Sequence, residues 1–128
     1  MKLLLDSHAL LWWLLEPSRL SGQARKVVAN RQNDIWVSAA TAWEILTKQR
    51  IGKLPSIGGV AANLFQEIQD EGFQPLGITF AHACLAGSFK QPHRDPFDRV
   101  LAAQTLLENL QLVSADPAFD QFGIERVW

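Results

Sequence analysis

The sequence is short of cysteine, of net charge and of long apolar runs, and each shortage argues against a class of protein. Its single cysteine, Cys84, cannot form an internal bridge, which argues against a secreted domain stapled by disulfides. The formal net charge is −1, whereas dedicated DNA-binding modules are usually basic. Asp6 and His8 interrupt the apolar N-terminal stretch, and no run reaches the roughly 18 residues of a membrane span. We therefore expect a cytoplasmic protein outside the membrane.

What the chain does have is the composition of one globular domain. Of its 128 residues, 48% are hydrophobic and 20% are charged. A chain of this length buries roughly two-thirds of its unfolded surface, so it needs no disulfide to fold. No repeat, linker or low-complexity segment divides it, and we predict a single domain over residues 1–128.

Short apolar runs alternate with longer segments of helical periodicity. The apolar runs predict strands at 2–5, 35–37, 73–78, 110–113 and 124–128. The periodic segments predict helices at 7–15, 22–31, 39–49, 60–70, 80–87 and 96–109, with a loop at Gly52 and Pro55. Five helices begin beside a residue that can cap them: Ser7, Ser21, Ser38, Thr79 and Asp95. This alternation indicates an α/β domain whose parallel sheet is covered on both faces.

Two acids each follow a predicted buried strand. Asp6 comes directly after the first strand, and Asp116 follows the strand at 110–113. In open parallel sheets, ligands bind in the crevice beyond the carboxyl ends of the strands, where acids from distant segments can converge. The alternative interpretation is that each acid only caps a helix or closes a turn.

Two further acids lie within predicted helices. For Glu44 the pattern alone favours an exposed ion pair with Lys48, one helical turn away. Asp95 before Pro96 is placed as a helix cap, which puts Asp98 at the third helical position, where the helix dipole favours an acid. Asp98 also shares a face with Leu101, so it can project from a wall of the crevice.

Taken together, the four acids predict a metal site. Carboxylates gathered in one crevice raise one another's pKa values, and a divalent cation removes that conflict. Carboxylate ligation without a convincing Cys/His cluster favours Mg²⁺ or Mn²⁺ over Zn²⁺. Such an ion lowers the pKa of bound water and screens a phosphodiester, so the predicted chemistry is metal-assisted hydrolysis of a polyanion at Asp6, Glu44, Asp98 and Asp116.

Four segments of the chain also resemble a known family. They are LLLDSHALLWWL around Asp6, VSAATAWEI around Glu44, RDPFDRVLAAQ around Asp98 and LVSADPAFDQFG around Asp116. In this order they resemble the PIN domain, and within it the VapC-type toxins of toxin–antitoxin pairs. Each segment alone is a weak match, but the four occur in the family's order and span nearly the whole chain.

The resemblance implies a fold and an activity. The fold would be a three-layer α/β/α sandwich around a central, mostly parallel sheet, and the activity a Mg²⁺- or Mn²⁺-dependent endoribonuclease of a type II toxin–antitoxin system. The four acids match the family's acidic quartet by position, and the assignment of Glu44 rests mainly on this match. The family pattern also implies a homodimer and a VapB-like antitoxin whose tail fills the acidic pocket.

Several other residues carry two interpretations. His8 either begins the first helix, which we favour, or touches substrate or a metal-bound water. His93 and Arg94 are placed to meet phosphate from a loop, and Asp95 is first a cap and second a neighbour of the site. Five basic residues can form a local basic rim around the site: Lys48, Arg50, Lys53, Lys90 and Arg99. We expect about half of them to be only solvated surface residues. Of the adjacent Trp12 and Trp13, one is expected at a partner or dimer surface.

Two other functions remain open from the sequence. The chain can be a non-catalytic interaction module whose acidic crevice docks a basic partner peptide. It can also be a phosphoryl-transfer enzyme with Asp6 as the nucleophile. That second alternative is weak, because His8 stands where the corresponding motif carries a second aspartate.

Overall fold

The computed structural model describes residues 1–54 and 57–128, and it is built around a five-stranded sheet. All strand pairings are parallel, in the order β3-β2-β1-β4-β5. The strands are β1 (Lys2–Leu5), β2 (Asp34–Ser38), β3 (Gln74–Leu76), β4 (Gln111–Val113) and β5 (Arg126–Val127). The predicted parallel sheet is therefore confirmed.

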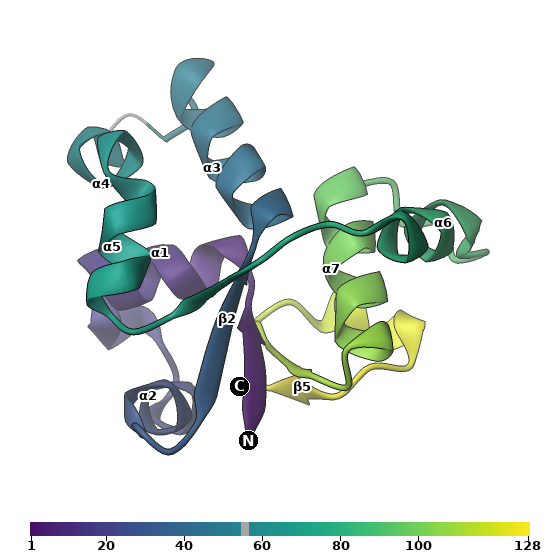
Figure 1. Cartoon of the computed structure of the whole chain (residues 1–128), viewed down its shortest axis with the longest axis horizontal. Coiled ribbons are helices and arrows are strands. Elements are labelled where there is room, and N and C mark those ends of the chain that lie inside the picture. Colours follow the sequence, from purple (N-terminus) through teal and green to yellow (C-terminus); the bar gives the residue numbers. More distant parts are fainter. Residues whose placement is uncertain (55–56) are drawn as a thin grey trace.

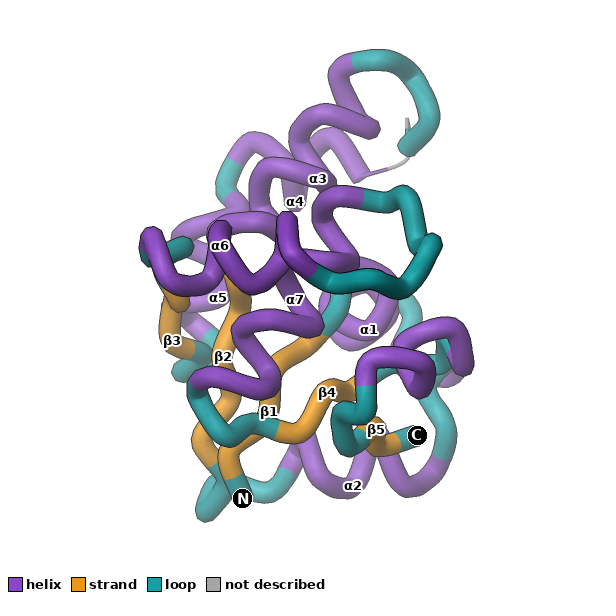
Figure 2. Tube along the Cα trace, turned by 90° about the vertical axis from the view of Figure 1, so that its right-hand side faces the viewer, coloured by secondary structure: helices purple, strands orange, loops and turns teal. Residues whose placement is uncertain are grey.

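Helices cover the sheet on both faces (Figure 1). The α-helices are α1 (Ser7–Leu15), α2 (Gly22–Ala29), α3 (Ala39–Arg50), α4 (Gly58–Ala62), α5 (Leu64–Asp70), α6 (Phe80–Ser88) and α7 (Pro96–Leu107). Two 3₁₀ helices complete the described elements, η1 (Pro17–Arg19) and η3 (Pro117–Phe122). Figure 1 places α1, α2 and α5 on one side of the sheet and α7 on the other. Figure 2, turned so that α6 and α7 face the viewer, shows the strands behind these two helices.

Alternate residues of the central strand supply two separate cores. Leu3 and Leu5 of β1 are fully buried in the core formed with α1, α2 and α5. Leu4 points the other way, into a core with Leu101 of α7 and Phe119 of η3. Successive side chains of a strand point to opposite faces, so an apolar run is required wherever both faces are covered. This arrangement confirms the three-layer α/β/α architecture.

Four of the five predicted caps are present, and one is wrong. The side chains of Ser21, Ser38, Thr79 and Asp95 each accept a backbone N–H at the start of their helices. Ser7, however, is the first residue of α1, and Asp6 is its cap: Asp6 Oδ1 accepts from the N–H of Ala9 at 2.8 Å. The carboxylate at the strand end takes the capping role because β1 stops at Leu5 and leaves Asp6 extended.

Some predicted element boundaries are also wrong. The helix expected over residues 60–70 is divided into α4 and α5 at Asn63, whose N–H returns to the carbonyl of Val60 and whose amide donates to the carbonyl of Gly59. The last strand covers only Arg126–Val127. The loop expected at Pro55 lies outside the described residues. No helix in the described part of the chain is long and apolar enough to cross a membrane.

Candidate acidic site at the carboxyl edge of the sheet

The parallel register brings three strand ends to the same edge of the sheet. Leu5 of β1 lies opposite Val37 of β2 and Val113 of β4. The N–H of Asp6 continues this ladder by donating to the carbonyl of Val113 at 3.2 Å. Directly beyond these ends, β1 leads to Asp6, β2 leads into α3, and β4 leads to the turn that carries Asp116.

Asp6 is the buried acid of the group. Only 6% of its surface is exposed, and burial raises the pKa of its carboxyl above the usual range. The negative charge of Glu44 raises this pKa further, while hydrogen bonding by Ser114 and Ala9 and the charge of His8 act in the opposite direction. The ionised form of Asp6 is therefore incompletely stabilised in this structure.

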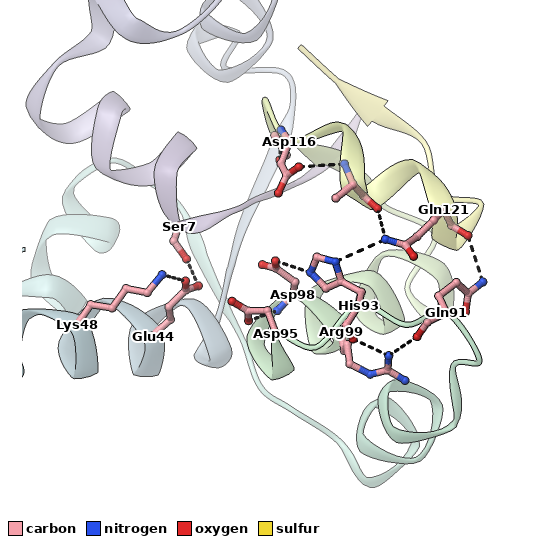
Figure 3. Close-up of polar contacts among 12 residues, drawn as sticks. Ser7, Glu44, Lys48, Gln91, His93, Asp95, Asp98, Arg99, Asp116 and Gln121 are labelled. Atoms are coloured by element: carbon pink, nitrogen blue, oxygen red, sulfur yellow. Dashed lines mark hydrogen bonds and ion pairs between the residues drawn. The ribbon is translucent and has the colours of Figure 1, made fainter. Parts of the chain in front are cut away.

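Glu44 is buried too, with 5% of its surface exposed, so the predicted exposed ion pair is only half right. The pair itself is present, since Lys48 Nζ lies 2.5 Å from Glu44 Oε2. The Ser7 hydroxyl donates to the other oxygen, Oε1, from the start of α1 (Figure 3). Because α1 packs against α3, a helix position that looks solvated in the sequence is covered in the fold.

Asp98 lies at the third position of α7, as predicted, and Asp95 caps that helix by accepting its N–H at 3.1 Å. His93 Nε2 lies 2.8 Å from Asp98 Oδ2. Burial raises the pKa of Asp98 to about 6, with the charges of Asp95 and Glu44 adding to the rise and the His93 hydrogen bond opposing it. The charge of Glu44 thus acts on both Asp6 and Asp98, and the charge of Asp95 acts on Asp98.

Asp116 lies at the same edge but is exposed. It caps η3 by accepting the N–H of Ala118 at 2.9 Å, and its own N–H donates to Ser114 Oγ. Figure 3 shows it above Asp98, with the α3 residue Glu44 to the lower left. The capping role that the sequence left open is therefore present for Asp6, Asp95 and Asp116 alike.

The chemical type of these side chains suits a divalent ion, but their positions in this structure do not yet form an ion-binding group. The donors are all carboxylate oxygens, which Mg²⁺ and Mn²⁺ prefer, and the raised pKa values of Asp6 and Asp98 mark negative charge that a cation would relieve. Across residues 1–54 and 57–128, however, no three His, Cys, Asp or Glu side chains form a group that could hold one ion. Glu44 is paired with Ser7 and Lys48, and Asp98 with His93, so binding would require these side chains to turn.

Two residues near the site, Arg99 and His93, make contacts other than those predicted. Arg99 is not part of a solvated basic rim, because its guanidinium donates to four backbone carbonyls, those of Ala86, Phe89, Gln91 and His93. It thereby fixes the loop that carries His93. The His93 ring faces Asp98 and packs beside Phe119 and Phe122 instead of reaching outward for phosphate. Both residues belong to the HRDPFDR segment, whose many charged residues mark it in the sequence. Its contacts, however, cannot be predicted from the pattern alone.

Among the lysines and arginines of residues 1–54 and 57–128, Lys48 is the one that forms an ion pair with an acid of this site. Burial alone would lower its pKa, but its hydrogen bond and ion pair with Glu44, together with the charges of Asp95 and Asp98, raise the net pKa above the usual value. The other expected rim residues Arg50, Lys53 and Lys90 are exposed. One fixed ammonium group therefore lies among the carboxylates.

Comparison with known proteins gives a family match over most of the chain. The model of the PIN domain matches residues 3–125. Among curated proteins, Ribonuclease VapC22 of Mycobacterium tuberculosis is 29% identical over 117 residues, which cover 88% of this chain and 85% of that protein. Ribonuclease VapC16 of the same organism is 37% identical over 60 residues, and this match covers 47% of the chain and only 43% of that protein.

Solved structures share the fold at low sequence identity. VapBC2 from Rickettsia felis, solved bound to a DNA fragment from its promoter, matches with a TM-score of 0.71 at 13% identity, covering 98% of this chain and 97% of that one. VapC20 of Mycobacterium tuberculosis, described as a Sarcin-Ricin loop cleaving toxin, matches with a TM-score of 0.69 at 13% identity, covering 95% of each chain. FitAcB from Neisseria gonorrhoeae matches with a TM-score of 0.66 at 19% identity, covering 97% and 95%.

Proposed function

Because the chain belongs to the PIN domain family, we propose that it is a Mg²⁺- or Mn²⁺-dependent endoribonuclease and the toxin of a type II toxin–antitoxin pair. The observation that carries the proposal is the group of acids at the carboxyl edge of the sheet, where Asp6, Glu44 and Asp98 share one electrostatic field. Two curated relatives are named ribonucleases, which supports the same activity.

Each acid has a proposed role that follows from its surroundings. Asp6, Asp98 and Asp116 would hold the ion, because each keeps a carboxylate at the strand edge and their backbone positions are fixed by helix caps. Glu44 would complete the site or orient the attacking water, with Ser7 and Lys48 setting its position. When bound, the ion would supply an activated water and neutralise charge on the phosphodiester. The Lys48 ammonium adds a protein-borne positive charge beside the substrate anion.

The proposed protein partner is a VapB-like antitoxin, and the acidic edge suits its basic tail. The structural neighbour from Rickettsia felis is described as VapBC2, a description that joins a VapB to the VapC. A basic tail would relieve the same uncompensated charge that a metal ion relieves. Metal and tail would then compete for one site.

A second copy of the chain is the other proposed partner. Three large apolar side chains on α3 and α5, here called the apolar patch, remain exposed: Trp43 by 65%, Leu46 by 43% and Phe65 by 59%, with Trp43 also touching Phe97 of α7. Leu46 and Phe65 also line a cavity of about 300 Å³ between these helices and β3. Exposed apolar patches of this kind mark protein interfaces. Trp12 and Trp13, one of which was expected at such a surface, are both half-buried against the core.

The test of catalysis is RNA cleavage with and without Mn²⁺ or Mg²⁺, by the wild type and by Asp6→Asn and Asp98→Asn. We expect metal-dependent cleavage by the wild type and losses of about 100-fold or more in both variants, because electrostatic groups at a reacting centre carry effects of this size. Asp34→Asn is the matched control, since Asp34 is an exposed acid at the amino end of β2. Undiminished cleavage by both folded variants would contradict the proposal.

A Mn²⁺ titration separates catalysis from the non-catalytic module. The wild type should bind Mn²⁺, and a basic peptide should displace it. If the purified protein binds no Mn²⁺ but still binds the peptide, the acidic edge is a docking site and the ribonuclease proposal is wrong.

A further inference from the structure

An exposed histidine stands beside the buried acids on the first turn of α1. Asp6 and Ser7 are buried, whereas His8 is exposed to solvent. Its imidazole stacks on the indole of Trp12, one helical turn later, with ring centroids 5.5 Å apart and planes 25° from parallel. Residues four apart on a helix lie one above the other, which allows the two rings to stack. One face of the imidazole is thus covered by Trp12, and the residue still faces solvent.

Trp12 is held in place from two other directions. The ring of Trp128 lies 5.7 Å away at 54°, and the guanidinium carbon of Arg19 lies 4.9 Å from the centroid of Trp12. A cation over an indole face is attractive by roughly 0.5–1 kcal/mol at exposed sites. His8, Trp12 and Arg19 also line a cavity of about 530 Å³, which is in the range of small-molecule sites. His8 is therefore stacked on a fixed indole ring at the edge of this cavity.

Core packing explains part of this arrangement. Trp12 and Trp128 pack against the buried core, and that role accounts for both indoles. It does not account for the imidazole at the outer end of the stack, which is exposed. A stacked aromatic side chain beside a guanidinium is the combination with which proteins bind single-stranded nucleic acid, since each base has a π-face and each nucleotide a phosphate.

We propose that His8 is the platform on which a base of single-stranded RNA stacks as the strand enters the acidic site. This inference rests on the proposed ribonuclease activity and adds a base-binding subsite to it. His8 follows Asp6 by two residues and is near enough for its charge to act on the Asp6 carboxyl, so a base on His8 would belong to a nucleotide near the phosphate at the acids. Arg19, over the Trp12 ring and 3.8 Å from Glu16, would meet the backbone of a neighbouring nucleotide by exchanging this ion pair for a phosphate.

The test compares variants that keep or remove the aromatic ring. Binding of a fluorescein-labelled single-stranded RNA is measured by anisotropy, in parallel with KM and kcat for its cleavage. We expect His8→Ala to weaken binding and raise KM about tenfold, which corresponds to roughly 1.4 kcal/mol of stacking, with kcat nearly unchanged. His8→Phe should bind as the wild type does. Phe80→Ala removes a ring that is 87% exposed on α6, and as the control it should change neither.

An RNA with one abasic nucleotide identifies the base as the ligand. If His8 stacks on that base, the wild type and His8→Ala should bind the suitably placed abasic RNA equally. Two results would overturn the platform: unchanged RNA binding by folded His8→Ala, or a loss of kcat in His8→Phe as large as in His8→Ala, which would place His8 in the chemistry. The proposed activity fails separately, if the wild type cleaves no RNA. Anisotropy still tests the platform in that case.

Discussion

At the acidic edge, burial of a charged carboxylate lowers the stability of the folded protein. Burial and neighbouring acids raise the pKa of Asp98 to about 6, although His93 donates to it. Proteins often carry such local costs where a ligand relieves them. This loss of unfolding free energy can be measured in the metal-free protein.

Replacing Asp98 by asparagine should stabilise the metal-free protein above about pH 6. Between the ordinary aspartate pKa of about 4 and the raised value, the folded state binds more protons than the unfolded state, so the free energy of unfolding falls as pH rises through this window. We expect Asp98→Asn to be about 1–3 kcal/mol more stable than the wild type at about pH 8, with the difference vanishing near pH 4. Urea unfolding at both pH values measures this difference in stability. A difference that stays constant with pH would show that the ionisation of Asp98 is not its cause.

The Glu44–Lys48 pair gives a second residue-scale prediction. Glu44 is buried while the Lys48 side chain is one-third exposed, so removing the lysine leaves a buried carboxylate with one partner fewer. We expect Lys48→Met to lower the free energy of unfolding by about 1–3 kcal/mol, and the double variant with Glu44→Gln to recover most of the loss. Denaturant unfolding of the four proteins of this cycle tests the coupling, and additive effects would show that the pair contributes nothing.

At the scale of elements, one arginine joins a helix end, a loop and the next helix. Arg99 of α7 donates to the carbonyls of Ala86 and Phe89 near the end of α6, and to those of Gln91 and His93 in the loop that follows. The carbonyls at a helix end lack partners within the helix, and the planar guanidinium supplies several at once. The position of His93 against Asp98 depends on this connection.

We expect Arg99→Lys to fail as a conservative substitution. A lysine cannot reproduce the fork of donors, so the variant should lose about 2–4 kcal/mol of unfolding free energy, and the amides of residues 88–94 should exchange faster with solvent. Hydrogen-exchange measurements locate the change. The matched control is Arg25→Lys on α2, where the arginine is exposed and a lysine should be tolerated. If the amides of residues 88–94 exchange equally fast in both variants, Arg99 does not hold this loop.

At the scale of the whole molecule, the parallel topology is what brings the acids together. Crossovers between neighbouring parallel strands return every strand in the same direction, so the ends of β1, β2 and β4 meet at one edge. On α3, which starts from this edge, Glu44 faces inward while Trp43 is exposed. One helix therefore serves the acidic site and the proposed dimer surface.

If the apolar patch joins two copies, charge placed in it should separate them. We expect Trp43→Glu and Phe65→Glu each to shift the protein from dimer to monomer, because a buried unpaired charge costs more than an interface of this kind can absorb. Sedimentation measures the mass. Leu107→Glu, at the exposed end of α7, is the control that should leave the mass unchanged. A wild type that is monomeric at every concentration would contradict the dimer.

The sequence by itself determined the features that depend on neighbours in the chain. Apolar runs specified strands buried on both faces, and Ser38, Thr79 and Asp95 marked helix starts, because a cap bonds to N–H groups two or three residues away. The crevice rule then placed Asp6 and Asp116 at one edge.

Only the tertiary structure decided the features that depend on segments far apart. Glu44 looked solvated until α1 covered it with Ser7, and Arg99 looked like a surface charge until its four carbonyl partners were gathered around it. In both cases the partners come from other segments of the chain, so periodicity within one helix cannot reveal them. Asp98 was placed correctly within its helix, but the burial and the neighbouring acids that raise its pKa exist only in the folded chain, as does the His93 contact that opposes the rise.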